Sequence, residues 1–512
     1  MTEQRPSPGR LRAALSGLIS GAVGLGLAEL FAGLVPGAPS PVTAVGALVI
    51  SLQPPNAKQL VVDLFGEADK LVLNLMVLAV ALALGAGLGI LARRHPGPAT
   101  AGFVAVGGVV LFAALRDPLN DGLLAVVAVV LAVGASLLVL RRLMASGTGE
   151  PRPAEMPDYA RRRFLGQAVA LGAVAAGSGV LGRVLLENRA AGVASMPAVP
   201  QPGSSVPPPP AGASLNVPGI TPLVTPNDSF YRIDTALLTP RVDVAEWRLT
   251  VDGMVERPFT IDYDELVAMP LVEQYVTIAC VSNEVGGRLV GNALWRGVRL
   301  RDLLERAGVM SGATQVVGRS LDGWTAGFPT AWLEAEGRES LVAVAMNGEP
   351  LPPQHGYPAR LIVPGLFGYV SATKWLSNIH LTTWESFDGY WVPLGWAKEG
   401  PILTQSRIDV PRDRANLEAG EVVVAGVAWA PDRGISAVEV RVDEEEWQPA
   451  ELAAPISDAT WVQWRYRWVA APGDHVLRVR ATDGTGQVQA EERTRPAPDG
   501  ARGHHTIDVQ VG

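Results

Sequence analysis

Cys280 is the only cysteine in the 512 residues of the chain, and it lies in the stretch VTIACVSNEVGG at 275–286. A single cysteine cannot form an intrachain disulfide, so it does not crosslink the fold. Two interpretations of its position are open. The side chain is either a small buried apolar group, or a thiolate kept for chemistry as a nucleophile or as a ligand of a soft metal.

The remaining residue types exclude several other kinds of site. The sequence contains no CxxC, CxxCH, HExxH or GxxxxGK[ST] pattern, which argues against zinc and iron–sulfur clusters, c-type haem, zinc proteases and nucleotide sites. None of the six histidines lies within an apolar run long enough to cross a membrane, so a transmembrane haem held by paired histidines is also disfavoured. The histidines are His95, His355, His380, His475, His504 and His505.

A second stretch that could do chemistry is MNGEPLPPQHGYPARLIVPGLFG at 346–368, which places His355 and Arg360 in a run rich in glycine and proline. A rigid loop of this kind could present backbone N–H groups, an imidazole and a guanidinium to an anionic group. The alternative is an ordered turn region that binds nothing.

Several motifs together resemble the sulfite oxidase family of molybdopterin enzymes. They are C-x-x-N at 280–283, GNALWRGVRLRDLL at 291–304, MNGEPLPPQHGYPARLIVPG at 346–365 and KWLSNIHL at 374–381. They occur in the family's order, and the resemblance covers about 215–512. It implies that Cys280 supplies its thiolate to molybdenum, a metal already bound by the dithiolene of molybdopterin, and a soft thiolate suits such a metal.

The resemblance also assigns roles to other residues. Arg232 in FYRID looks like the family's arginine beside the metal, and Tyr390 in FDGYW, after a short gap, looks like its active-site tyrosine. The cofactor contacts that the resemblance implies are Arg232, Asn283, Asp322, His355, Arg360, Thr373 and Lys374.

Some positions depart from the family pattern. Asp234 stands where the family often has a histidine, and Glu284 and Val285 occupy places where animal sulfite oxidases carry arginines that help to bind sulfite. Arg495 and Arg502 are both weak matches for the substrate-binding arginine that the family contributes from near the chain's end. We therefore expect a pocket that is less cationic than a dedicated sulfite site.

The elements before about residue 190 indicate a membrane domain. Apolar runs at roughly 13–35, 71–92, 98–115, 122–140 and 164–182 approach the ~20 residues that a helix needs to cross the bilayer hydrocarbon. The run PVTAVGALVISL is too short to span and is expected in an outer loop.

Arginines beside these runs predict the orientation, because cytoplasmic flanks carry an excess of basic residues. The clusters are Arg10 and Arg12, Arg93 and Arg94, Arg141 and Arg142, and Arg161, Arg162 and Arg163. All four clusters lie in the cytoplasm only if the N-terminus is cytoplasmic and the chain crosses the membrane five times. The chain after about residue 187 then lies on the extracytoplasmic side. The stretch RRRFLGQAVALG also resembles a twin-arginine export signal, with an ordinary positive flank as the alternative.

The remaining chain is predicted to be water-soluble. A helix is expected within GVRLRDLLERAGV at 297–309, with Leu300, Leu303, Leu304 and Ala307 on one face. Segments of alternating apolar and polar residues after about 405, separated by turn signals, predict an antiparallel β-sandwich. The predicted domains are 1–145 (four spans), 146–187 (twin-arginine-like segment and fifth span), 188–217 (Pro-rich linker), 218–400 (molybdopterin-binding catalytic domain) and 401–512 (β-sandwich).

The predicted fold class is thus an N-terminal α-helical transmembrane bundle, an α+β sulfite-oxidase-type molybdopterin domain and a C-terminal immunoglobulin-like β-sandwich. The last resembles the family's dimerisation domain, which makes a homodimer conceivable. A net charge of −8 without a basic stripe argues against a nucleic-acid binder.

The predicted function is a molybdopterin oxidoreductase anchored in a bacterial cell membrane with its catalytic domain outside, which transfers an oxygen atom to or from a small oxyanion such as sulfite. No second redox centre is visible in the sequence, so a separate electron carrier such as a cytochrome is implied. Two alternatives stay open: a reductase of sulfoxides, for example of oxidised methionine in exported proteins, and a non-catalytic membrane binding or assembly module.

Overall fold

The computed structural model describes residues 9–53, 69–145, 159–191, 196–203, 205–334 and 339–512. The chain divides into two compact units. Unit 1 comprises Met1–Ala194 with Thr235–Arg241, and unit 2 comprises Ser195–Asp234 with Val242–Gly512.

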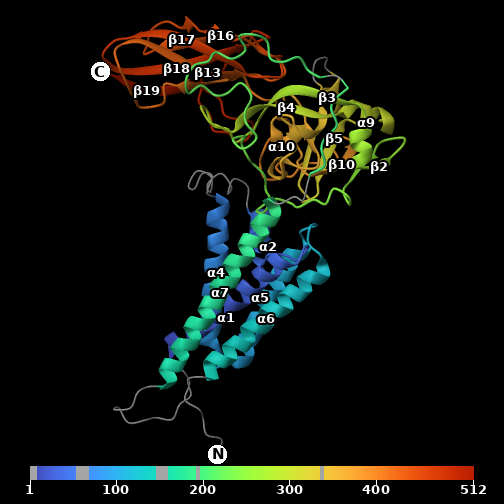
Figure 1. Cartoon of the computed structure of the whole chain (residues 1–512), viewed down its shortest axis with the longest axis vertical. Helices are drawn as coiled ribbons and strands as arrows, with labels where there is room; N and C mark the ends of the chain where they lie inside the picture. Colours follow the sequence, from blue (N-terminus) through green and yellow to red (C-terminus); the bar gives the residue numbers. More distant parts are fainter. Residues whose placement is uncertain (1–8, 54–68, 146–158, 192–195, 204, 335–338) are drawn as a thin grey trace, which may run out of the picture. The chain divides into compact units, whose positions relative to one another are not determined.

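Unit 1 is a bundle of helices that lie side by side (Figure 1). Its described helices are α1 (Arg10–Leu34), α2 (Pro41–Leu52), α4 (Asp69–Ala92), α5 (Pro96–Leu115), α6 (Gly122–Ala145) and α7 (Tyr159–Ala191). Within the described residues, all of these except α2 are long and apolar enough to cross a membrane. They coincide with the five runs that the sequence predicts, while the crossing itself stays a prediction.

Small residues let α1 pack closely against α4, α6 and α7. A Cβ atom added at Gly17 would lie 2.1 Å from the carbonyl oxygen of Gly85 in α4, and one added at Gly26 would lie 2.5 Å from that of Ala175 in α7. Helices in an apolar solvent gain from such close backbone approach, because packing replaces the hydrophobic effect as the main driving force there.

The carboxylate of Glu29 in α1 organises the start of α2. Its oxygens accept hydrogen bonds from the Ser40 hydroxyl at 2.8 Å and from the Val42 backbone N–H at 3.0 Å. Ser40 in turn accepts from the N–H of Thr43, as an N-cap does. The Glu29 side chain therefore anchors the start of this short helix.

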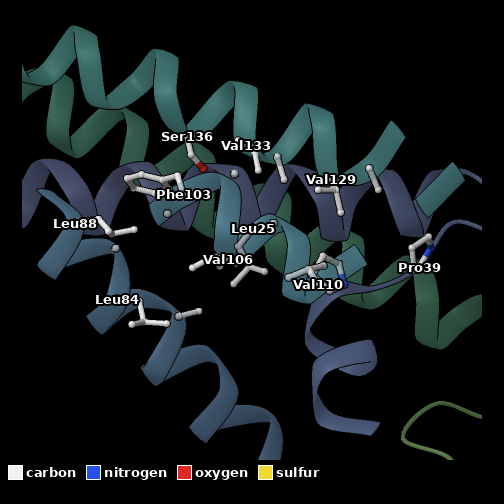
Figure 2. Close-up of a pocket in the computed structure, with 18 residues that line it drawn as sticks. Leu25, Pro39, Leu84, Leu88, Phe103, Val106, Val110, Val129, Val133 and Ser136 are labelled. Carbon is white, nitrogen blue, oxygen red and sulfur yellow. The ribbon is translucent and has the colours of Figure 1, made fainter. Parts of the chain in front are cut away.

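A cavity of about 110 Å³ lies among α1, α4, α5 and α6 (Figure 2). Apolar side chains such as Leu84, Leu88, Phe103 and Val133 line it, and Ser136 is the one polar side chain among its lining residues. A lining of this composition offers no group for redox or acid–base chemistry.

The part of unit 2 before about residue 400 contains two sheets. One has the strand order β2-β1-β10-β5-β6, and the other has the order β3-β4-β7-β8, with β9 paired to β7. The strands are β1 (Arg248–Gly253), β2 (Phe259–Asp262), β3 (Leu271–Ala279), β4 (Val290–Arg299), β5 (Gln315–Ser320), β6 (Thr325–Pro329), β7 (Leu341–Met346), β8 (Glu349–Pro350), β9 (Arg360–Ile362) and β10 (Leu376–Thr382). The helical segments are α8 (Tyr263–Ala268), α9 (Leu300–Ala307), η2 (Thr330–Leu333), η3 (Pro353–His355) and α10 (Gly368–Ser371).

Helix α9 is the helix expected within 297–309, but it is shorter than that range. Residues 297–299 belong to strand β4, because they pair with β7. The helix ends at Gly308, whose φ of +69° is a left-handed conformation that glycine adopts without steric cost. The four residues predicted for one face are buried as a group: Leu300, Leu303, Leu304 and Ala307.

The C-terminal part of unit 2 is built from two sheets that share an apolar core. One sheet contains β11 (Gln405–Val410), β13 (Gly420–Trp429), β17 (Val462–Ala470) and β16 (Glu451–Leu452) in that order. The other contains β12 (Ala415–Leu417), β19 (His505–Val511), β18 (Gly473–Asp483), β14 (Ile435–Val442) and β15 (Gln448–Pro449). Each alternating segment of the sequence forms a strand here, since every second side chain enters the core.

Hydrogen bonds tie this C-terminal part to strand β3. The N–H of Thr277 donates to the carbonyl of Ala459 at 2.9 Å, and the Thr277 hydroxyl accepts from the N–H of Trp461 at 2.8 Å. The end of β3, where Cys280 follows, is thereby fixed from both parts of unit 2.

Candidate functional site

Cys280 follows β3 directly, at the start of the loop that leads to β4. Its side chain is buried, and its backbone N–H donates to the carbonyl of Leu289 at 2.9 Å. The side-chain oxygen of Asn283 accepts from the N–H of Leu289 at 2.8 Å, and the N–H of Asn283 donates to the carbonyl of Cys280. Asn283 therefore closes the loop that presents Cys280.

The C-terminal sheets hold the same loop from the other side. Arg407 in β11 donates from Nη1 to the carbonyl of Gly287 at 2.7 Å. Gly286 has a φ of +77°, and a Cβ atom there would lie 2.2 Å from the ring of His505 in β19. The Nδ1 atom of His505 accepts from the N–H of Ile408, and burial lowers the pKa of His505 to about 4, so the ring is neutral.

A buried basic group lies around η3 and β9. The Nε2 atom of His355 is 2.9 Å from the carbonyl oxygen of Asn227, which places the ring proton on Nε2 and leaves Nδ1 as an acceptor. Burial lowers the pKa of His355 to about 4. Arg360 donates from Nη1 to the carbonyl of His355 at 3.0 Å, and burial lowers its pKa to about 10.

Lys374 adds a second buried cation, and Asp234 connects it to Arg232. Lys374 donates from Nζ to the carbonyl of Gln354 and to Oδ2 of Asp234, both at 3.0 Å. The Nε atom of Arg232 donates to the same Asp234 oxygen at 3.1 Å. Burial lowers the pKa of Lys374 to about 8, and the charge of Asp234 opposes that shift. Arg232 is the accessible member, with 40% of its side chain exposed against 6% for Asp234.

Tyr231 links the cysteine to the basic group, and the sequence analysis did not identify it. Burial and then the charge of Cys280 raise its pKa, while Arg360 lowers it, so the phenol lies within electrostatic reach of both. Its ring stacks on Phe230 with centroids 5.2 Å apart, and Phe230 contacts the ring of His355. Tyr231 could have been predicted as a site residue from its position directly before Arg232 in FYRID.

Asp322 and Tyr390 form a neighbouring pair. Asp322 accepts the N–H of Trp324 at 3.0 Å, and burial raises its pKa, with a further contribution from the charge of Asp234. Burial and then the charge of Asp322 raise the pKa of Tyr390, so its phenol stays protonated at neutral pH. The titratable residues expected in the site thus influence one another electrostatically, and Tyr390 does so through Asp322.

Buried polar atoms that lack a hydrogen-bond partner indicate whether the site suits a polar ligand such as molybdopterin. Among the described residues, His355 Nδ1, Arg360 Nε and Thr373 Oγ1 are buried without a hydrogen-bond partner. Each such group costs about 1–3 kcal/mol when it stays unpaired, so a polar ligand that satisfies them is favoured. The described residues offer no cluster of three His, Cys, Asp or Glu ligands. A metal held by Cys280 therefore needs its other ligands from an organic cofactor, and the residues fit that requirement.

The loop after Cys280 carries Glu284, Val285 and, further along, Arg288. Glu284 is exposed, and Val285 is buried. Arg502 is paired with Asp499, with 2.6 Å between Nη2 and Oδ2. Of Arg232, Arg360 and Lys374, Arg232 is the most accessible to solvent.

Comparisons with known proteins agree with this chemistry. Residues 236–391 match the oxidoreductase molybdopterin binding domain. An uncharacterized oxidoreductase of Bacillus subtilis, YuiH, is 38% identical over 158 residues, which are 31% of this chain and 76% of that protein. Mitochondrial sulfite oxidase of Mus musculus is 30% identical over 317 residues, a match that covers 52% of this chain and 57% of the mouse enzyme.

A solved structure supports the fold of the same region. The sulfane dehydrogenase SoxCD from Paracoccus pantotrophus superposes with a TM-score of 0.51 at 22% identity, over 57% of this chain and 82% of that one. At this identity the likeness concerns the fold alone. Two findings show the family: the match to the molybdopterin binding domain, and the similarity to YuiH over 76% of that protein. The chain belongs to the molybdopterin-binding oxidoreductases, and it is an oxidoreductase whose cofactor is molybdenum bound to molybdopterin.

Proposed function

We propose that this oxidoreductase is anchored in a membrane and transfers an oxygen atom to or from a small sulfur oxyanion, with sulfite as the first candidate. The observation that carries the proposal is the arrangement of the buried thiol of Cys280, the buried cations Arg360 and Lys374, and the accessible cation Arg232 in one site. A mammalian relative named sulfite oxidase supports the choice of substrate.

The bound cofactor supplies a two-electron redox couple and the oxygen-atom exchange. Cys280 would hold the metal through its thiolate, which a soft metal prefers. Arg360 and Lys374 would neutralise the anionic part of the cofactor, and His355 would accept a hydrogen bond at Nδ1. Arg232 would draw an anion toward the reacting centre.

Tyr390 would act as a hydrogen-bond donor to the substrate. Its raised pKa keeps the phenol protonated over the neutral range, so it can donate without losing its proton. Asp322 beside it would orient that phenol.

Sulfoxide reduction is the second candidate function, and two observations favour it. Glu284 and Val285 place an exposed carboxylate and a buried apolar group on the loop after Cys280, where cations would help to capture sulfite. A neutral sulfoxide needs no such cations.

The proposed membrane topology depends on where the arginine clusters lie in the helical bundle. The guanidinium of Arg12 lies 4.4 Å from the ring centroid of Phe164, and Phe164 shares an apolar cluster with Leu143. The first half of α1 packs against the last half of α4 through Gly17 and Gly89. The four arginine clusters therefore lie near one end of the bundle, which supports a cytoplasmic end and an outside catalytic unit.

Two further parts of the proposal concern export and partners. Arg161 and Arg162 lie in the first turn of α7, where they would be read as a twin-arginine signal. Electrons would leave to, or arrive from, a separate carrier such as a cytochrome, and the C-terminal sheets would serve a homodimer.

The test is a steady-state assay of the purified full-length protein with its molybdenum content measured. Sulfite is offered with artificial electron acceptors, and dimethyl sulfoxide and methionine sulfoxide are offered with reduced dyes. Sulfite turnover that depends on Cys280 supports the first candidate, and sulfoxide turnover alone supports the second. A fully loaded enzyme that is inert toward all three compounds contradicts both.

A further inference from the structure

Asp234 lies between two cations of the site, Arg232 and Lys374. Its Oδ2 atom is 3.1 Å from Nε of Arg232 and 3.0 Å from Nζ of Lys374. The Asp234 side chain is 6% exposed and that of Lys374 is 11% exposed, whereas Arg232 reaches solvent with 40% of its side chain. One buried carboxylate oxygen therefore holds two positive charges.

This arrangement contributes to the charge that an approaching substrate meets. Arg232 and Lys374 contribute two positive charges and Asp234 one negative charge, so the trio carries a net charge of one. The buried oxygen lies close to both cations, and charges in a partly desolvated site are screened less than at the surface. An anion near Arg232 is thus attracted by the arginine and repelled by Asp234 a few ångströms away.

The geometry points to Asp234 as a specificity-determining residue that weakens the capture of dianions and leaves neutral oxygen-atom donors or acceptors unaffected. This inference rests on the proposed function only for the identity of the substrates, because the charge arrangement itself belongs to the chain. The Asp234 carboxylate accepts a hydrogen bond from Nε of Arg232, so its negative charge lowers the affinity of this guanidinium for an anion.

The test uses the full-length, molybdenum-loaded protein and inorganic sulfate, a non-reacting dianion, as the probe. Sulfate affinity is measured by calorimetry for the wild type, Asp234→Asn, Asp234→Glu and Asp228→Asn. Asp228 is an exposed residue of the same segment that accepts a hydrogen bond from Ser229, so its substitution removes the same charge outside the trio.

The measurements are made at about pH 6.5. Burial leaves Lys374 with a pKa of about 8, and removal of Asp234 lowers that pKa further, so a lower pH favours the charged form of the lysine in the variants. Molybdenum content is determined for each preparation.

Asp234→Asn is expected to bind sulfate about ten-fold more tightly than the wild type at low ionic strength, with the gain shrinking as salt is added. Asp234→Glu and Asp228→Asn should match the wild type within about two-fold, and the apparent KM for dimethyl sulfoxide should change less in Asp234→Asn than the sulfate affinity does.

Equal sulfate affinity of loaded wild type and Asp234→Asn overturns the inference. So does a tighter binding that Asp234→Glu shares, because the charge would then not be its cause. If Asp234→Asn loses molybdenum, Asp234→Ser is measured in its place. Loss from both variants also overturns the inference, because it assigns Asp234 to cofactor retention. A wild type that turns over neither sulfite nor sulfoxide contradicts the proposed function, while the sulfate measurement still decides the role of Asp234.

Discussion

Replacement of Arg407 by methionine should loosen the loop that presents Cys280, although the two residues are 127 positions apart in the sequence. The guanidinium makes three short contacts, each of 2.7 Å: Nη1 to the Gly287 carbonyl, Nη2 to the Thr221 hydroxyl and Nε to the Asp409 carboxylate. Methionine retains the apolar stem but none of these donors.

The magnitude follows from burial. The side chains of Arg407 and Asp409 are each 8% exposed, so Arg407→Met leaves a carboxylate buried without its cation. Breaking one side of a buried ion pair typically costs about 3–5 kcal/mol. With roughly 2–4 °C per kcal/mol for a large domain, the unfolding midpoint of unit 2 should fall by about 6 °C or more.

The double variant Arg407→Met/Asp409→Asn separates stability from loop position. The second change removes the unpaired charge, so a large part of the lost stability should return. The Gly287 carbonyl still lacks its donor, so the loop stays less restrained. We therefore expect the electron paramagnetic resonance signal of Mo(V) to be altered in both variants, whereas thermal unfolding is affected mainly in the single one.

The refuting result is a double variant with recovered stability and an unchanged Mo(V) signal. It would mean that the loop geometry at Cys280 is independent of the C-terminal sheets. A single variant as stable as the wild type would separately refute the estimate for the buried pair.

Four other perturbations have defined outcomes. Cys280→Ser should abolish turnover in a protein that still folds, because oxygen replaces thiolate poorly at a soft metal; more than a few per cent of activity at full molybdenum loading contradicts this. Arg232→Gln should lower kcat/KM for sulfite by about ten-fold or more, because a charge-assisted hydrogen bond is lost, and should lower kcat/KM for a neutral sulfoxide far less. Unchanged sulfite kinetics in molybdenum-loaded enzyme would show that Arg232 does not line the substrate pocket. Replacing Arg161 and Arg162 by lysine should strand the catalytic unit in the cytoplasm, and continued protease accessibility in spheroplasts would mean that both are only a positive flank. The folded pKa of His505, about 4, lies below the ordinary 6.5, so its contribution to stability is complete above about pH 6.5 and is lost as pH falls toward 4, by about 3 kcal/mol in all. The unfolding temperature plotted against pH should therefore slope more steeply in the wild type than in His505→Gln, and equal slopes contradict the assignment.

Much of the architecture follows from local patterns. The apolar runs that became α1, α4, α5, α6 and α7 have the length and uniform hydropathy of membrane helices. The segments after residue 405 with alternating apolar and polar residues form strands, because a two-residue period matches the alternation of side chains along a β-strand. The one-sided helix near residue 300 was also predictable, although its start was not, since pairing of 297–299 with β7 depends on another strand.

The chemistry was predictable where a motif is contiguous. The stretch around His355 and Arg360 brings both side chains to one buried site, because the two residues are only five positions apart. The identity of the soft-metal ligand followed from a single cysteine within a resemblance that extends over several motifs.

Contacts between distant segments had no such signal. Tyr231 meets the charge of Cys280 across 49 residues, Asp234 shares its oxygen with Lys374 across 140, and His505 packs on Gly286 across more than 200. Residue type and spacing determine periodicity, burial and the list of groups capable of chemistry, because these depend on neighbours along the chain. The charge that a substrate meets and the support beneath the cysteine were decided by folding, because electrostatic and packing energies depend on distance in space.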